Sequence, residues 1–131
     1  MKKLLFVLGV STLIYSCKPE RLATPYPILN PPQWFVGEWN YSDSTGILER
    51  MTVSETNLII QSVESNSTMD YIDYFKTNDI SYKEMFNHNI SYGFEYSENN
   101  VVKEINFGII GDNEVRFMDE NGPTLKTFKK E

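Results

Sequence analysis

Histidine and cysteine, which often perform acid–base and nucleophilic chemistry near neutral pH, are scarce in this sequence. The chain of 131 residues holds one histidine, His88, and one cysteine, Cys17. His88 lies between two asparagines, a composition typical of an exposed turn, where no neighbouring group would orient it as a general base. No cluster of histidines or cysteines has the spacing of a metal site, and the sequence has no glycine-rich phosphate loop. We therefore expect no enzyme activity, no cofactor and no metal.

Cys17 stands at the end of a pattern typical of an export signal. Two lysines near the start precede an apolar run, residues 4–13, which is too short to span a bilayer. Ile14-Tyr15-Ser16-Cys17 then resembles the lipobox of bacterial lipoproteins. This resemblance implies that residues 1–16 are a signal peptide, removed by cleavage before the cysteine. It also implies that the Cys17 sulfur receives a diacylglyceryl group and that the new amine is acylated, with palmitate among the expected chains.

A proline-rich segment follows the cysteine. Residues 17–33 hold five of the six prolines of the chain, which disfavours helix and predicts a semi-extended tether. Within this segment, the short apolar patch at residues 26–29 has two interpretations, either as part of the tether or as a contact with the domain. The folded domain is predicted at residues 34–131.

The predicted domain consists of short runs in which apolar and polar residues alternate, separated by turns rich in Asn, Asp, Gly and Ser. The clearest run, residues 90–96, places Ile90, Tyr92, Phe94 and Tyr96 on one face. This pattern predicts an all-β fold, a small antiparallel meander that forms a barrel or a half-open sheet of about eight strands. The strands are expected at residues 37–42, 47–54, 57–63, 79–86, 90–97, 101–110, 113–118 and 123–129.

Residues 69–76 fit two patterns. Met69, Ile72 and Phe75 have helical spacing, whereas Met69, Tyr71 and Phe75 fit a strand interrupted by Asp73. The sequence leaves helix and strand open here, and at most one short helix is expected in the domain.

The domain begins with Pro32-Gln33-Trp34-Phe35-Val36-Gly37-Glu38-Trp39. Gly-x-Trp at the start of a first strand resembles the signature of lipocalins. Following a lipobox and a proline-rich linker, it resembles the lipocalin-like (calycin-type) lipoproteins of Bacteroidetes. The resemblance covers residues 32–130 in layout, but only this opening in specific residues. It implies that Gly37 permits a tight start to the strand, that Trp39 plugs the closed end of a barrel, and that a basic residue stacks on Trp39. The nearest candidate for that basic residue is Arg116.

An aromatic stripe is the strongest candidate for a ligand site. It comprises Tyr92, Phe94 and Tyr96, with Phe107 and Phe117 on neighbouring strands. The stripe is either the packed core of a small barrel or the lining of a pocket for an apolar or amphipathic ligand. Two functions stay open. The first is a small-ligand-binding module. The second is a protein-interaction module, such as an inhibitor of an envelope hydrolase or an accessory subunit of a cell-surface complex.

The charge of the chain limits the choice of partners. Its net charge is −6, which argues against binding to nucleic-acid phosphates or to anionic lipid head groups. Attachment to a membrane would therefore depend on the acyl chains at Cys17. We expect a monomeric protein of the cell envelope, lipid-anchored to the outer membrane and either periplasm-facing or surface-exposed.

Overall fold

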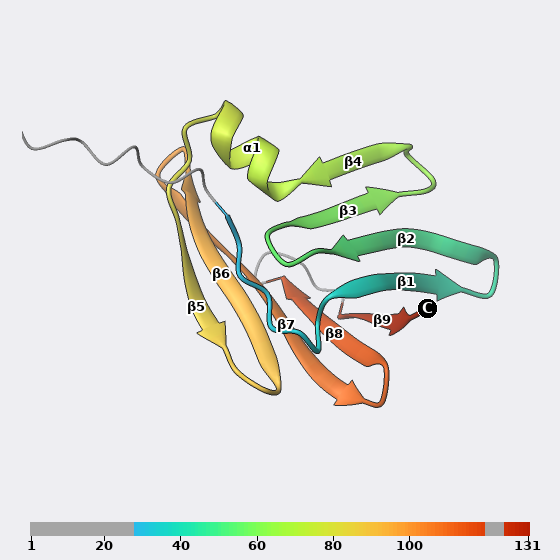
Figure 1. The fold of residues 1–131 in the computed structure, drawn as a ribbon. Coiled ribbons are helices and arrows are strands. Elements are labelled where there is room, and N and C mark those ends of the chain that lie inside the picture. Colours follow the sequence, from blue (N-terminus) through green and yellow to red (C-terminus); the bar gives the residue numbers. More distant parts are fainter. Residues whose placement is uncertain (1–27, 120–124) are drawn as a thin grey trace, which may run out of the picture.

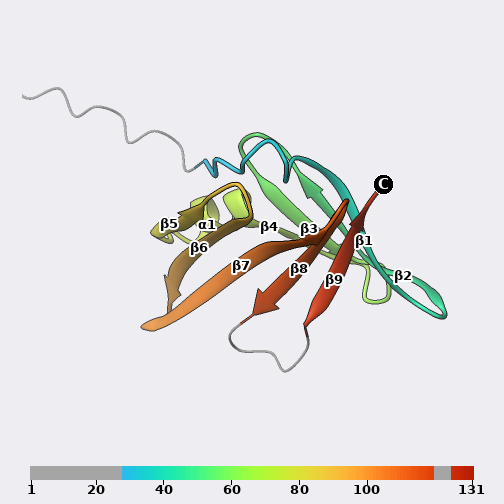
Figure 2. The same ribbon diagram turned by 90° about the horizontal axis from the view of Figure 1, so that it is seen from below.

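Nine antiparallel strands form one sheet, which curls into a half-barrel with a single short helix (Figures 1 and 2). The computed structural model describes residues 28–119 and 125–131. The all-β antiparallel meander predicted from the sequence is confirmed. The elements are β1 (Gly37–Asp43), β2 (Gly46–Val53), β3 (Leu58–Ser62), β4 (Ser67–Asp70), α1 (Tyr71–Thr77), β5 (Tyr82–Asn87), β6 (Ser91–Glu98), β7 (Val101–Gly111), β8 (Glu114–Asp119) and β9 (Lys126–Lys130).

Several predictions made from the sequence fall outside the described residues. They are the signal peptide at residues 1–16, the lipidated Cys17, the tether up to residue 27 and the first residues of the strand expected at 123–129. Within the part of the chain that the structure describes, no helix has the length and apolar character needed to cross a membrane.

The strand order is β4-β3-β2-β1-β9-β8-β7-β6-β5, so the first and last strands of the chain are neighbours. Trp39 on β1 lies opposite Met51 on β2 and opposite Lys130 on β9. This pairing joins two meanders into one sheet whose outer edges are β4 and β5. Helix α1 lies between these two edges, where a closed barrel would have a further strand pairing (Figure 1).

Tight turns made by asparagine connect the long strands. Asn99 and Asn100, between β6 and β7, have φ angles of 51° and 63°, and Asn113, between β7 and β8, has 61°. Asparagine tolerates this left-handed conformation, and two such residues in succession match the twist of the paired strands. The turn residues identified in the sequence therefore set these hairpins.

Residues 69–76 combine both of the patterns seen in the sequence. Strand β4 runs through Met69 to Asp70, and α1 begins at the next residue. The Asp70 side chain caps the helix by accepting a hydrogen bond from the Asp73 N–H at 3.0 Å. The helix then buries Tyr71 and Phe75, which are four residues apart on one face. The ninth strand, β4, was not predicted.

Residues 28–31, called the strap below, connect the two halves of the sheet near α1. Leu29 is fully buried, and its N–H donates to the Thr56 carbonyl in the β2–β3 turn at 3.0 Å. On the other side, the Asn30 carbonyl accepts from Asn87 Nδ2 on β5 at 2.8 Å. The Ile28 carbonyl also accepts a hydrogen bond from the Tyr82 hydroxyl on β5. The described part of the apolar patch, residues 28 and 29, therefore contacts the domain.

Candidate functional site

The aromatic stripe predicted from the sequence forms the packed interior of the half-barrel. Its members are at most 8 % exposed, namely Tyr92, Phe94, Tyr96, Phe107 and Phe117. Their rings contact one another, with centroids 6.2 Å apart for Tyr92 and Phe94 and 5.0 Å apart for Phe107 and Phe117. Helix α1 covers them, since the Tyr71 ring meets Phe94 edge-on at 5.2 Å. At these positions the interior is filled by side chains.

Tyr92 connects this core to the strap. Its hydroxyl donates to Glu84 Oε1 at 2.7 Å, and the same carboxylate accepts from the Asn30 N–H at 2.6 Å and from Asn30 Nδ2 at 3.2 Å. Burial raises the pKa of the Tyr92 phenol far above its usual value, and the hydrogen bond to Glu84 raises this pKa further. Tyr92 therefore remains a neutral donor that holds Glu84 toward the strap.

Trp39 is buried near the end of the sheet where β1 begins and β9 ends, which is called the sealed end below. It is 2 % exposed, and its indole N–H donates to the Phe35 carbonyl at 2.8 Å. Phe35 is itself fully buried, and its ring centroid lies 5.9 Å from that of Trp39. The described segment before β1 thus buries a second aromatic ring beside Trp39, which sequence reasoning missed.

The basic residue over Trp39 is Lys130, and the choice of Arg116 was wrong. Lys130 Nζ lies 5.2 Å from the Trp39 ring centroid, whereas Arg116 is exposed on the outer face of β8. The pairing of β1 with β9 places Lys130 opposite Trp39, a contact between distant parts of the sequence. Gly37 has a φ of 142°, and a Cβ atom there would stand 2.7 Å from Lys130 Cε. Gly37 therefore gives the lysine stem room to cross the end of the barrel.

Trp34 and His88 meet at the same sealed end. The Trp34 indole N–H donates to the His88 carbonyl at 2.9 Å, and the Trp34 ring packs against Phe35 with centroids 5.3 Å apart. His88 is exposed in the turn between β5 and β6, which its N–H closes by donating to the Ser91 carbonyl at 2.9 Å. Across the described residues, no group of three or more His, Cys, Asp or Glu side chains could hold a metal ion.

Polar groups lie on the inner face toward the opposite, open end of the half-barrel. Lys126 Nζ is 2.6 Å from Glu49 Oε1, with the two side chains 28 % and 19 % exposed, and it lies 5.8 Å from the Tyr41 ring centroid. A second inner-face ion pair joins Lys103 to Glu98. Sequence reasoning missed both pairs. Glu49 is two residues before the buried Met51 on β2, so both side chains lie on the same face of the strand. This spacing could have predicted that Glu49 faces inward.

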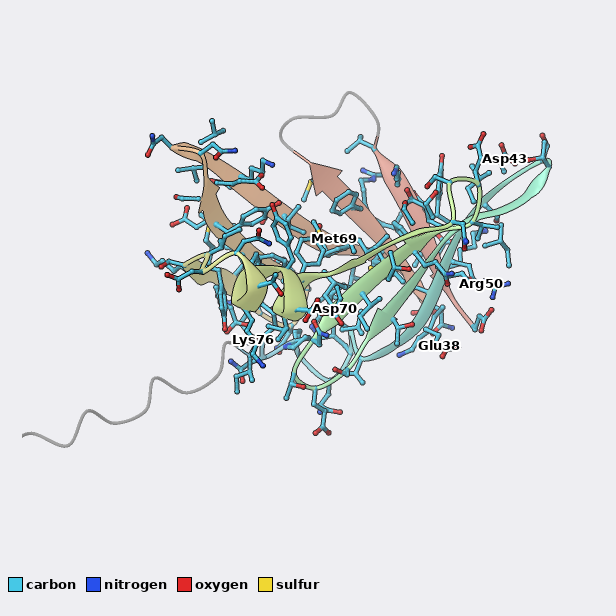
Figure 3. All side chains as sticks on the ribbon, turned by 90° about the horizontal axis from the view of Figure 1, so that it is seen from above. Glu38, Asp43, Arg50, Met69, Asp70 and Lys76 are labelled. Atoms are coloured by element: carbon cyan, nitrogen blue, oxygen red, sulfur yellow. The ribbon has the colours of Figure 1, made fainter. Side chains whose placement is uncertain are left out.

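Half-buried apolar side chains accompany these ion pairs. Ile60 on β3 and Met69 on β4 lie opposite each other and pack against the core, yet both stay partly exposed. Figure 3 shows Met69 on the inner side of the sheet, whereas Glu38 and Arg50 lie on the outer side. The inner face therefore changes from a dry aromatic core at the sealed end to a mixed apolar and charged surface at the open end.

The chain matches no family model, no curated protein and no solved structure.

Proposed function

We propose that this protein is an exported lipoprotein whose domain binds a small amphipathic ligand on the inner face of the half-barrel. The observation that carries the proposal is the Glu49–Lys126 ion pair beside half-buried apolar side chains on that face. Burying charges costs free energy that a well-packed apolar pair would not. A surface with apolar area and a few oriented polar groups is also the usual composition of a small-ligand site.

The position of the ion pair suggests how such a ligand would lie. Lys126 on β9 lies opposite Phe117 on β8. Glu49 on β2 lies opposite Tyr41 on β1, the strand between β2 and β9. The apolar part of a ligand would cover Ile60 and Met69, which lie opposite each other and stay partly exposed, while its polar group would meet the ammonium or carboxylate. The Trp39 plug with Lys130 above it supports a lipocalin-like layout, in which capture occurs at the end away from the tryptophan.

In this proposal the domain binds its ligand without catalysis. An acid–base catalyst needs a titratable group that is held in a cleft by partners. His88 is exposed in a turn, and the Glu84 carboxylate is occupied by Tyr92 and by the strap. These two arrangements support a binding function.

The expected anchor can be tested at a single atom. We expect Cys17→Ser to abolish acylation and to move the protein from the membrane fraction to the soluble fraction, or to leave the signal peptide uncut. The reason is that the thioether to the diacylglyceryl group needs the sulfur, and stable attachment takes two or more acyl chains. The measurement is incorporation of radiolabelled palmitate, with wild type as the control. Continued labelling of the Cys17→Ser chain would refute the anchor.

Ligand binding can be tested with two adjacent isoleucines of β3 that face opposite ways. Ile60 pairs with Met51 and Met69 on the inner face, whereas Ile59 pairs with Thr52 and Asp70 on the outer face. We expect Ile60→Trp to weaken binding of dodecanoate by about tenfold, which is about 1.4 kcal/mol, because the indole would occupy the ligand volume. The measurement is displacement of N-phenyl-1-naphthylamine fluorescence, using the Cys17→Ser chain.

Ile59→Trp is the matched control, since it adds the same bulk on the outer face. Dodecanoate affinity in this variant should stay within about twofold of wild type, a change below about 0.5 kcal/mol. Equal weakening in both variants would show that the effect is general destabilisation. The absence of any probe displacement in wild type would rule out the proposed ligand class.

A second candidate function, a protein-interaction module, is favoured by exposed apolar side chains on the outer face. Val102 is 55 % exposed and Met118 is 42 % exposed, while edge strand β5 presents Phe86 at 39 %. Partner surfaces expose such residues, although scattered ones are also normal. Loss of partner binding in Met118→Asp, with dodecanoate binding absent from wild type, would favour this candidate over the first.

A further inference from the structure

A hollow lies at the sealed end, away from the inner-face site. Its volume is about 230 Å³, below the 300 Å³ or so at which pockets for drug-sized ligands begin. It lies between the segment before β1 and the turn that joins β7 to β8. Its walls include Trp34, Ile109, Asp112, Asn113, Glu114 and Lys130. The hollow therefore has room for one ring-sized ligand.

One wall of this hollow is apolar and held in place. The Trp34 indole is fixed by its hydrogen bond to the His88 carbonyl and by its contact with Phe35, and it remains partly exposed. Ile109 beside it is 37 % exposed, and its N–H is bonded to the Ile90 carbonyl at 2.9 Å. A planar aromatic surface of this kind, already immobilised, suits contact with the C–H face of a ring.

The rest of the lining is mainly polar, and part of it is also held in place. The Asn113 carbonyl accepts from the Lys130 N–H at 2.8 Å, which ties the β7–β8 turn to the end of β9. Glu114 pairs with Lys129 at 3.3 Å. Among the described residues, no hydrogen bond or ion pair engages the Asp112 carboxylate or the Asn113 side-chain amide. These two groups can accept from, and donate to, the hydroxyls of a ligand.

The charges of the walls decide the class of ligand. The Asp112 and Glu114 carboxylates disfavour an anion, and the Lys130 ammonium, held over Trp39, disfavours a cation. A neutral ring with one apolar face and several hydroxyls satisfies the aromatic wall, the carboxylate and the amide together. We propose that this hollow binds a single neutral sugar residue, such as the end of a glycan chain.

The test uses the indole N–H signals in nuclear magnetic resonance spectra of the ¹⁵N-labelled Cys17→Ser chain. The sequence holds two tryptophans, so only Trp34 and Trp39 contribute. The probes are the methyl glycosides of glucose, galactose, mannose and N-acetylglucosamine. We expect at least one of them to shift the Trp34 signal saturably, with a Kd of about 1–10 mM, because the hollow offers few contacts. No saturable shift from any of the four probes at about 100 mM would overturn the proposal.

A matched pair of variants locates the binding. Asp112→Ala should raise the Kd about tenfold, the usual effect of losing one charge-assisted hydrogen bond. Glu64→Ala, an exposed turn carboxylate at the open end, makes the same charge change and should leave the Kd within about twofold. An unchanged Kd in Asp112→Ala, or an equal shift produced by glycerol, would overturn the proposal. Dodecanoate binding should be the same in both variants, since that site lies on the inner face.

Discussion

Trp39→Ala is expected to lower the free energy of unfolding by about 3–5 kcal/mol, the usual cost of emptying a large buried aromatic site. Trp39 is 2 % exposed, and its ring contacts Phe35 while Lys130 lies over its face. Removing the indole also leaves the Phe35 carbonyl without its donor. A domain of this size has only about 5–15 kcal/mol of stability, so the variant should be poorly folded.

The measurement is thermal unfolding followed by circular dichroism. A loss of 3 kcal/mol corresponds to about 12 °C or more for a domain near one hundred residues. Trp39→Phe is the control, because it keeps an aromatic ring and loses the N–H, and it should cost about 1–2 kcal/mol. A shift of only a degree or two in Trp39→Ala would show that the ring contributes little to the core, and the proposed lipocalin-like layout would lose its main support.

The strands could be predicted because their side chains alternate between the interior and solvent. Seven of the expected strands correspond to β1, β2, β3, β5, β6, β7 and β8, since turn residues bound them. Their ends agree within one residue, except that β5 begins at Tyr82, three residues after its expected start. Strand β4 escaped prediction because Ser67 and Thr68 are polar and exposed, so no apolar period marks them. It exists because its backbone pairs with β3.

The candidate site was less accessible from the sequence. The inward direction of Tyr92, Phe94 and Tyr96 follows from strand period and is confirmed by their burial. The partner of Trp39 could not be deduced, because the pairing of β1 with β9 brings Lys130 across nearly the whole chain. The Asn30–Glu84 contacts of the strap are likewise contacts between distant residues, which local pattern does not encode.

Gly93→Ala on β6 is the second substitution for which we expect a large loss of stability, because the outer face is closely packed at this residue. Asn106 on β7 lies directly opposite, and a Cβ atom on Gly93 would stand 2.1 Å from Asn106 Oδ1 and 2.9 Å from the Ile105 carbonyl oxygen. No real Cβ atom tolerates such approaches, and one of the two obstacles is backbone. Because Tyr92 and Phe94 flank the glycine in the core, β6 cannot shift without disturbing the packed aromatic interior. We expect Gly93→Ala to cost about 3 kcal/mol, the upper end of the range for overpacking.

Gly108 on β7 provides the matched control for Gly93→Ala. A Cβ atom there would meet nothing closer than the Ile90 carbonyl oxygen at 3.9 Å, which is ordinary contact. Gly108→Ala should therefore stay within about 0.5 kcal/mol of wild type in urea unfolding. The double variant Gly93→Ala/Asn106→Ala separates the two obstacles. It should recover part of the loss, because Asn106 Oδ1 is gone and only the Ile105 carbonyl still opposes the methyl group. Equal stability of Gly93→Ala and Gly108→Ala would mean that β6 and β7 are not packed this closely.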